Sequence, residues 1–164
     1  MSAAKSKQPR SNDAAAPSRF SHRAYSIRLR TSLPSTKPAL NRGVRAVLKI
    51  ARACGWVPDQ LTDLEIALRE ALANAIIHGN SLQRGKRVFL RCYARPRRSL
   101  MIVVRDEGDG FNPTGVPDPR DDHRLHLPSG RGLLLMRELM DHVEYRRGGR
   151  EVLLVAHRPA ASES

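Results

Sequence analysis

The sequence predicts an α/β fold, built as a two-layer sandwich in which helices cover one face of a mixed, mostly antiparallel sheet. Three observations carry this prediction: two successive amphipathic helix patterns, two pairs of strand patterns joined by tight turns, and a further apolar helix between those pairs. The 164 residues are enough for one compact domain. Because 40% of the residues are hydrophobic and only 4% are aromatic, aliphatic side chains must form most of the core, and a fibrous or fully disordered protein is excluded.

The first half of the chain contains one strand pattern and two helix patterns. Apolar and polar residues alternate from Tyr25 to Arg30, which predicts a strand. A helix is predicted from Pro34, where Pro38 also favours a helix start, to Gly55. A second helix is predicted from Pro58 to Gly79, beside the first, because apolar residues recur at helical spacing: Leu61, Leu64, Leu68, Ala71, Leu72 and Ala75.

The second half contains two strand pairs, with a long connection and a helix between them. Tight turns join the strands of each pair, residues 87–95 with 100–105 and residues 143–146 with 151–157. The connection from Asp106 to Gly130 is rich in glycine and proline and shows no sustained period, which is typical of a lid, a binding loop or a disordered segment. The helix after it is predicted to begin at Gly130 to Gly132 and to continue to Met140.

The net charge of +13 is compatible with nucleic acid, an anionic membrane, ATP or an acidic protein as partner, and does not choose among them. Part of this charge lies in residues 1–24, where five basic residues stand against one acidic residue and large apolar side chains are nearly absent. We expect residues 1–24 to be a disordered basic tail, residues 25–158 to form the domain, and residues 159–164 to be a disordered C-terminus.

Membrane and secretory segments are not expected. The longest apolar runs have strand length, far below the roughly 20 residues that cross a bilayer, and no apolar segment follows the N-terminal lysines. Cys54 and Cys92 are far apart and lack the spacing of a zinc site or a disulfide framework. We therefore expect a cytoplasmic protein that does not act at a membrane.

Three polar residues, Glu70, Asn74 and His78, recur at every fourth position of the second predicted helix and therefore share one face. Taken alone, they are compatible with a solvated stripe on an amphipathic helix. Their neighbours from Ala67 to Ile77 are nearly all small or apolar, which indicates a helix buried on most sides. Buried carboxylates and amides need partners, so these three residues are candidates for a functional site.

A second candidate is the run from Asp106 to Gly110, directly after an apolar strand. Gly108 and Gly110 let the backbone turn sharply and approach a ligand closely, and the Asp106 carboxylate can accept a hydrogen bond from a purine amino group. A plain turn of glycine and aspartate is the alternative. A calcium loop is poorly supported, because glycine stands at position 108, where such a loop needs a second oxygen ligand.

A third candidate is the start of the last predicted helix, from Ser129 to Gly132. Unpaired N–H groups and the helix dipole favour an anion there, Gly130 and Gly132 leave room for a phosphate, and Arg131 adds positive charge. An ordinary glycine-rich helix start is the alternative.

Two further patterns carry less weight. The long connection contains a cluster of possible metal ligands, Asp121, Asp122, His123 and His126. Because no further ligand on a rigid element accompanies them, we expect a solvated lid rather than a metal site. The run from Gly79 to Arg87 differs from a phosphate-binding P-loop, because its glycine spacing is one residue too long and arginine replaces the required serine or threonine.

The order of the three candidates is more specific than any one of them. An acid-x3-Asn helix, a strand that ends in D-x-G-x-G, a long loop and a G-x-G helix start together resemble the nucleotide site of the Bergerat-fold, histidine-kinase-like (GHKL) ATPases. The segment from Glu70 to Gly79, EALANAIIHG, is similar nearly residue for residue to the helix signature of the bacterial anti-sigma-factor serine/threonine kinases. The resemblance covers residues 25–157 and implies that the loop between Phe111 and Ser129 is a long ATP lid.

The resemblance also implies roles for the polar residues of the second helix. It assigns Asn74 to a single Mg²⁺ ion that otherwise binds phosphate oxygens and water. It makes Glu70 the general base, which takes a proton from a seryl or threonyl hydroxyl or from water. His78 is assigned only to the pocket edge, with a packed or capping histidine as the alternative.

The remaining assignments concern the nucleotide. Asp106 would hold the adenine amino group, with Gly108 and Gly110 shaping the base pocket. The residues implied to face the phosphates are Gly130, Arg131 and Gly132. One departure is visible on the last hairpin, where many family members have a threonine near the adenine and this chain has Gly149 to Val152.

The resemblance implies an ATP-binding serine/threonine protein kinase that acts as an anti-sigma factor. Such a protein binds a sigma factor, phosphorylates a small anti-sigma-factor antagonist, and forms a homodimer through the face around its first strand and first helix. A catalytically weak nucleotide-sensing or nucleic-acid-associated binding module is the alternative, motivated by the charge of +13 and the changed hairpin position. Nucleic acid would then bind through the basic tail, which we do not favour.

Overall fold

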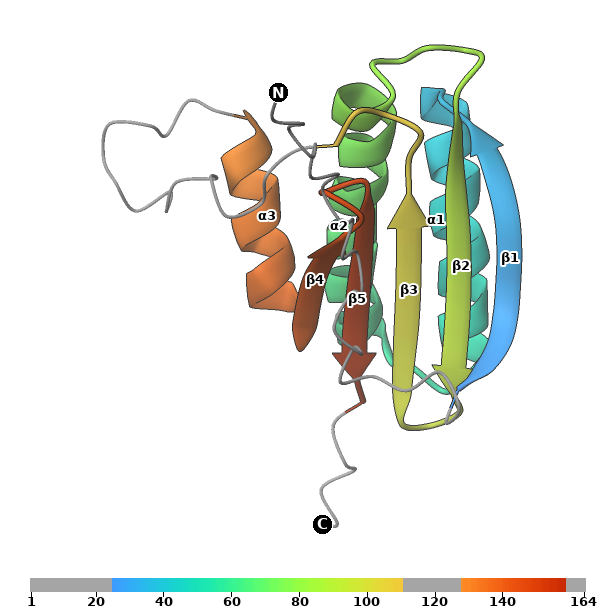
Figure 1. Ribbon diagram of the computed structural model, residues 1–164. Coiled ribbons are helices and arrows are strands. Elements are labelled where there is room, and N and C mark those ends of the chain that lie inside the picture. The colour runs from blue at the N-terminus through green and yellow to red at the C-terminus, as the bar shows by residue number, and fades with distance from the viewer. Residues whose placement is uncertain (1–24, 111–127, 159–164) are drawn as a thin grey trace, which may run out of the picture.

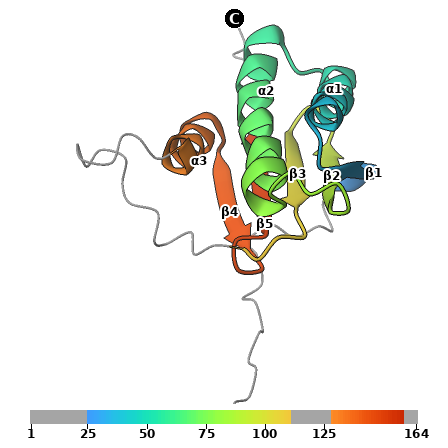
Figure 2. The same cartoon turned by 90° about the horizontal axis from the view of Figure 1, so that it is seen from above.

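The structure is a computed structural model and describes residues 25–110 and 128–158. Within these ranges, helices cover one face of a five-stranded sheet (Figure 1). Figure 2, seen from above, shows α1, α2 and α3 on the same side of the sheet. The predicted two-layer α/β fold is confirmed.

The described elements divide between the two layers. In chain order they are β1 (Ser26–Pro34), α1 (Lys37–Ala53), α2 (Pro58–Ala73), the π-helical segment η2 (Asn74–Gly79), β2 (Arg87–Arg95), β3 (Ser99–Arg105), α3 (Pro128–Leu139), β4 (His142–Arg146) and β5 (Glu151–His157). The strand order is β1-β2-β3-β5-β4, and each neighbouring pair in this part of the chain is antiparallel, where a mixed sheet was predicted. Because β5 pairs with β3, the last hairpin leaves β4 at the sheet edge.

The boundary between the first strand and the first helix differs from the prediction. β1 continues to Pro34, which is paired with Arg87 of β2, so the helix begins only at Lys37. Proline is tolerated there because β1 is an edge strand and one side of its backbone needs no partner. Thr36 caps the helix, since its hydroxyl accepts a hydrogen bond from the Ala39 N–H at 3.4 Å.

The second predicted helix forms, but it is not regular throughout. It is α-helical from Pro58 to Ala73 and π-helical from Asn74 to Gly79. The Asn80 N–H continues this wider pattern, donating to the Ala75 carbonyl, five residues back, at 2.8 Å. Apolar periodicity predicts one continuous helix because it does not report which carbonyl each N–H reaches. π-Helical turns are rare and occur frequently at functional sites, and this one lies at the C-terminal end of the central helix.

Helix α2 forms the centre of the helical layer. Leu64, Leu68, Leu72 and Ile76, on successive turns of α2 and η2, are fully buried in the main core. The helix packs between α1 and α3 and lies over the sheet (Figure 2). Burial of each such side chain stabilises the fold by about 1.5–3 kcal/mol. A helix held on three sides can present polar groups at defined positions.

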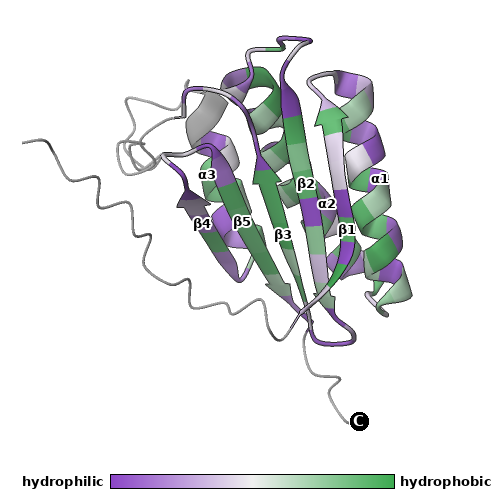
Figure 3. Ribbon diagram, turned by 45° about the vertical axis from the view of Figure 1, so that its right-hand side comes forward, coloured by the Kyte–Doolittle hydropathy of each residue, from purple (hydrophilic) through white to green (hydrophobic). Residues whose placement is uncertain are grey.

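The face of the sheet opposite to the helices has an apolar centre. Met101, Val103, Leu153 and Val155 of β3 and β5 form a second buried cluster there. Figure 3 shows that β3 and β5 are hydrophobic along most of their length, whereas β4 is hydrophilic. Continuous apolar runs are expected of strands that are buried on both faces, and the two central strands of this sheet fit that rule.

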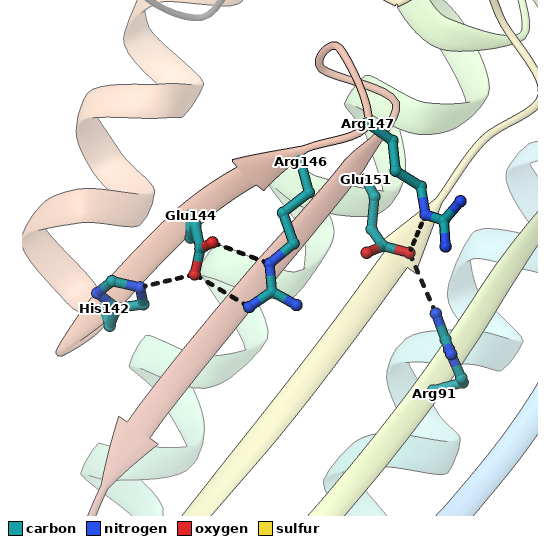
Figure 4. A network of polar contacts seen from close by, with 6 residues as sticks. All are labelled: Arg91, His142, Glu144, Arg146, Arg147 and Glu151. Atoms are coloured by element: carbon teal, nitrogen blue, oxygen red, sulfur yellow. Dashed lines mark hydrogen bonds and ion pairs between the residues drawn. The ribbon is translucent and has the colours of Figure 1, made fainter. Parts of the chain in front are cut away.

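Two ionic clusters also lie on the sheet (Figure 4). On β4, Glu144 Oε1 lies 3.0 Å from Arg146 Nε. Across β2 and β5, Glu151 Oε2 lies 3.1 Å from Arg91 Nη2 and 3.5 Å from Arg147 Nε. Successive side chains of a strand point to opposite faces. Because the flanking residues belong to the main core, both clusters lie on the face away from the helices.

Three predicted segments lie outside the described residues: the tail 1–24, the lid 111–127 with its Asp and His cluster, and the C-terminus 159–164. The expectations about them remain predictions. No helix in residues 25–110 or 128–158 combines the length and the apolar character that a membrane span would require.

Candidate functional site

A cavity of about 380 Å³ opens at the end of the sheet where η2 lies. Its apolar wall is formed by Ala71, Ala75, Val104, Leu133 and Val152. Its polar wall includes Asn74, His78, Asp106, Asp109, Tyr145 and Arg150. These residues come from α2, η2, α3 and three strand ends, so only the folded chain brings them together. An apolar pocket with a few convergent polar groups is typical of a small-molecule site.

Four of the predicted site residues line this cavity: Asn74, His78, Asp106 and Gly110. The described lining does not include Glu70, Gly108, Arg131 or Gly132. Glu70 lies one turn before Asn74, and Gly108 packs against Gly79 in the opposite wall. Gly130, Arg131 and Gly132 lie inside α3, because this helix begins at Pro128 rather than at the glycines.

Asp106 follows the last residue of β3, and its carboxylate lies against the backbone of Gly79. A Cβ atom on Gly79 would lie 2.6 Å from Oδ2 and 2.8 Å from Oδ1, so only glycine leaves room for the carboxylate. The Gly108 N–H donates to Oδ1 at 2.8 Å. Burial raises the pKa of Asp106, while the Gly108 hydrogen bond and the charge of Arg150 lower it. The carboxylate is thus held in one position at the cavity wall.

Gly108 and Gly110 let backbone segments approach each other closely beside this carboxylate. A Cβ atom on Gly108 would collide with the carbonyl oxygen of Gly79, and one on Gly110 with that of Gly148. Gly110 also has a φ of +83°, a conformation that side-chain-bearing residues rarely adopt. The two glycines therefore allow η2, the end of β3 and the last hairpin to lie in direct contact.

Asn74, the first residue of η2, and Tyr145 of β4 both line the cavity. The two side chains form a hydrogen bond, which lowers the pKa of Tyr145. Burial outweighs it and raises that pKa to about 12, so the phenol is protonated at neutral pH. Tyr145 was missed in the sequence, because a tyrosine in an alternating strand looks like any other half-buried residue.

Glu70 lies against the start of α3. A Cβ atom on Gly132 would be 2.5 Å from Glu70 Oε2 and 3.7 Å from Asn74 Nδ2. The glycine predicted to leave room for a phosphate therefore also leaves room for these two side chains. Arg131, its neighbour, is exposed. The three predicted constellations thus meet at one end of the sheet.

The residues present fit a purine nucleotide. The apolar wall suits the faces of a base, and the fixed Asp106 carboxylate is an acceptor at its edge. Asn74 supplies an amide oxygen, which Mg²⁺ can bind together with phosphate and water, and the Glu70 carboxylate lies beside it at Gly132. In the described part of the chain, no three His, Cys, Asp or Glu side chains gather as in an all-protein metal site.

The changed hairpin position also belongs to the cavity. The cavity is lined there by Gly149, Arg150 and Val152. None of them has the hydroxyl group of the threonine that many members of the family carry near the adenine. Asn80, which lies directly after η2 and is fully buried, was also missed in the sequence, because an asparagine after a helix is usual and does not reveal its burial.

Comparison with known proteins agrees with this geometry. The family model described as "Histidine kinase-like ATPase domain" matches residues 33–156, a range that includes every residue of the cavity lining. The chain therefore belongs to the histidine kinase-like ATPase domain family. Membership implies the use of ATP.

Individual relatives share part of the sequence. Serine-protein kinase RsbW of Bacillus subtilis (strain 168) is 33% identical over 103 residues, which cover 57% of this chain and 62% of the relative. The anti-sigma F factor of Oceanobacillus iheyensis is 30% identical over 90 residues, or 52% and 60% of the two chains. That of Clostridium acetobutylicum is 35% identical over 88 residues, again 52% and 60%. The aligned region spans about three fifths of the length of these relatives.

Proposed function

We propose that this protein is an ATP-dependent serine/threonine protein kinase that acts as an anti-sigma factor. The observation that carries the proposal is the convergence of Glu70, Asn74 and Gly132 beside a cavity whose far wall holds the Asp106 carboxylate. Relatives named as a serine-protein kinase and as anti-sigma F factors support the same activity. The protein would bind a sigma factor and phosphorylate a small anti-sigma-factor antagonist.

In this proposal the nucleotide lies along the cavity. Asp106 accepts a hydrogen bond from the adenine amino group, Gly108 and Gly110 shape the base pocket, and His78 lies at its edge. The start of α3 receives the phosphates, through three residues that combine backbone N–H groups with one positive charge: Gly130, Arg131 and Gly132.

Asn74 and Glu70 act at the phosphate end. The Asn74 amide oxygen would bind Mg²⁺, which neutralises phosphate charge when bound. Glu70 accepts the proton of a seryl or threonyl hydroxyl as its oxygen bonds to the γ-phosphorus and the bond to the ADP oxygen breaks. Carboxylate Oε2 lies at the surface of α3, next to Gly132, where an incoming hydroxyl can approach.

The same proposal includes a homodimer formed through the face around β1 and α1, and a cytoplasmic location. Support for the homodimer comes from the family resemblance, and β1 is available for it because it lies at an edge of the sheet. Size measurements in solution at several protein concentrations test the dimer directly.

Calorimetric titration of ATP at near-physiological salt, with and without Mg²⁺, tests the site. A strongly basic protein attracts ATP non-specifically, and Mg²⁺ weakens that attraction by neutralising phosphate charge. We expect one ATP per chain and tighter binding with Mg²⁺, and an Asn74→Ala variant in which Mg²⁺ no longer tightens it. Binding that Mg²⁺ only weakens would contradict the assigned site.

A nucleotide-sensing or nucleic-acid-associated module with weak catalysis is the second candidate. The charge of +13 and the absence of the family's threonine from residues 149–152 favour it. Non-specific contacts to nucleic-acid phosphates weaken strongly as the salt concentration rises to roughly 150–200 mM. Binding of DNA or RNA that persists at this concentration would support this candidate. Phosphate transfer from ATP to a serine or threonine of a partner protein would support the kinase instead.

A further inference from the structure

We propose that Asn80 is a positioning residue that holds the Asp106–Gly108 turn in the geometry needed to recognise the nucleotide base. The inference rests on the proposed ATP site, and no part of the sequence resemblance assigns a role to Asn80.

The Asn80 side chain is completely buried and is hydrogen-bonded through both its nitrogen and its oxygen. Its Nδ2 donates to the Ser35 hydroxyl at 2.8 Å and to the Arg87 carbonyl at 2.9 Å. Its Oδ1 accepts from the Glu107 N–H at 2.8 Å. One amide therefore joins the segment after β1, the start of β2 and the segment after β3. Buried networks of this kind, when fully satisfied, make a region rigid.

The hydrogen bond to Glu107 restrains Asp106, the residue proposed to bind the adenine amino group. The Glu107 N–H belongs to the peptide that follows Asp106, so holding it restricts rotation of the Asp106 backbone. One residue further along, the Gly108 N–H binds Asp106 Oδ1 at 2.8 Å. The Glu107 carboxylate fixes the turn from the other side, accepting from the Arg87 N–H at 2.6 Å. Without Asn80, two of these constraints remain, but the first peptide of the turn loses its partner.

Asn80 also belongs to the opposite wall. Its own N–H donates to the Ala75 carbonyl at 2.8 Å, within the π-helical pattern of η2 that carries Asn74 and His78. The backbone of Asn80 is thus part of the helical wall, while its side chain holds the end of β3. Asn80 therefore joins the helical wall to the segment that carries the Asp106 carboxylate.

The chemistry of the site specifies an asparagine. Two acceptors, Ser35 Oγ and the Arg87 carbonyl, and one donor, the Glu107 N–H, surround the side chain. Only a carboxamide offers two N–H donors and one acceptor at this size. Alanine would remove the acceptor of the Glu107 N–H and both donors to Ser35 and Arg87.

The test compares the full chain with its Asn80→Ala and Ser35→Ala variants. The Ser35→Ala variant is a matched control, because it removes one bond of the same side chain and leaves the bond to Glu107. Two quantities are measured: hydrogen exchange of the Glu107 and Gly108 amides without nucleotide, and the affinities for ATP and for inosine triphosphate, which lacks the amino group that Asp106 would bind.

For Asn80→Ala we expect exchange of the Glu107 amide to rise by about tenfold or more, since local opening becomes easier. The ratio of ATP affinity to inosine triphosphate affinity should fall by about fivefold or more, because discrimination depends on the Asp106 position. For Ser35→Ala both quantities should stay within about twofold of the wild type.

An unchanged affinity ratio in Asn80→Ala, with both nucleotides weakened equally, would overturn the proposal in favour of a purely structural role. Unchanged exchange at Glu107 would overturn it as well. Should Asn80→Ala not fold, Asn80→Ser replaces it, because a serine hydroxyl is too short to reach Glu107. If the wild type binds no ATP, the proposed function fails, whereas the exchange measurement still decides whether Asn80 holds the turn.

Discussion

The two ends of the cavity are built in different ways. At the end that contains Asp106, glycines leave no space for side chains and the backbone hydrogen bonds fix the carboxylate. At the other end, Glu70 lies against Gly132 of α3, and the adjacent Arg131 is exposed. The first arrangement suits recognition of a rigid base by a preformed pocket, and the second suits transfer to an incoming protein.

The largest effect is expected at the transfer end. In Glu70→Gln the amide cannot accept a proton from the attacking hydroxyl or water. The rates of ATP hydrolysis and of phosphate transfer to a protein should therefore fall by about 10²–10⁴-fold. ATP affinity should stay within about threefold of the wild type, because Glu70 does not line the cavity. Release of ADP measures the first quantity and calorimetry the second. Glu65→Gln on the same helix, where Glu65 pairs with Arg69 at the surface, is the control. Turnover that survives in Glu70→Gln would remove Glu70 as the base.

At the base end, Gly79→Ala should cost both stability and binding. The new Cβ would lie 2.6 Å from Asp106 Oδ2, so the carboxylate must move. Overpacking of this kind destabilises by about 1–3 kcal/mol, and ATP affinity should fall by about tenfold or more with the loss of the fixed acceptor. Denaturant titration and calorimetry measure the two effects. Gly85→Ala is the matched control, since no atom lies within 4 Å of its added Cβ. Equal behaviour of the two variants would mean that the base end is not tightly built.

Asp106→Asn should separate binding from stability. ATP affinity should fall by about tenfold, because a neutral amide is a weaker acceptor than a carboxylate. The protein should become more stable at neutral pH, since burial raises the pKa of Asp106 above 3.8 and the ionised form is therefore unfavourable in the folded state. This advantage should disappear as the pH falls through the raised pKa, where the wild-type group takes up its proton. Denaturant titrations across that pH range measure it. A variant less stable than the wild type at neutral pH would contradict the direction of the shift.

The smallest effect is expected on the face of the sheet away from the helices, at Glu144 on β4 (Figure 4). Hydrogen bonds from Arg146 and from His142 lower the pKa of this carboxyl. Its contribution to stability is therefore present above the ordinary pKa of 4.5 and is lost as the pH falls through the lowered value. Glu144→Gln should cost at most about 1 kcal/mol at neutral pH, as for other partly exposed pairs. ATP affinity should not change. A change in affinity would show that the sheet surface is coupled to the cavity.

Much of the fold could be predicted because the signals are local. The strands Arg87–Arg95 and Glu151–His157 have the predicted bounds, since each is an apolar run closed by turn residues. The error at Pro34 arose because proline can also start a helix, and pairing of Pro34 with Arg87 outweighed that tendency. The π-helical turn could not be predicted, because it depends on hydrogen bonds between η2 and the residues after it.

The sequence by itself determined the elements, their order and the chemistry of the candidate residues Glu70, Asn74 and Asp106, because periodicity and motif spacing are properties of neighbouring residues. The tertiary structure alone decided that Asp106 lies against Gly79, that Tyr145 is bonded to Asn74, and that Asn80 joins three segments. These contacts link residues distant in sequence or depend on the space that folding leaves. A local sequence pattern cannot predict such contacts. They form because a buried polar group needs a partner, and only packing decides which partner lies within reach.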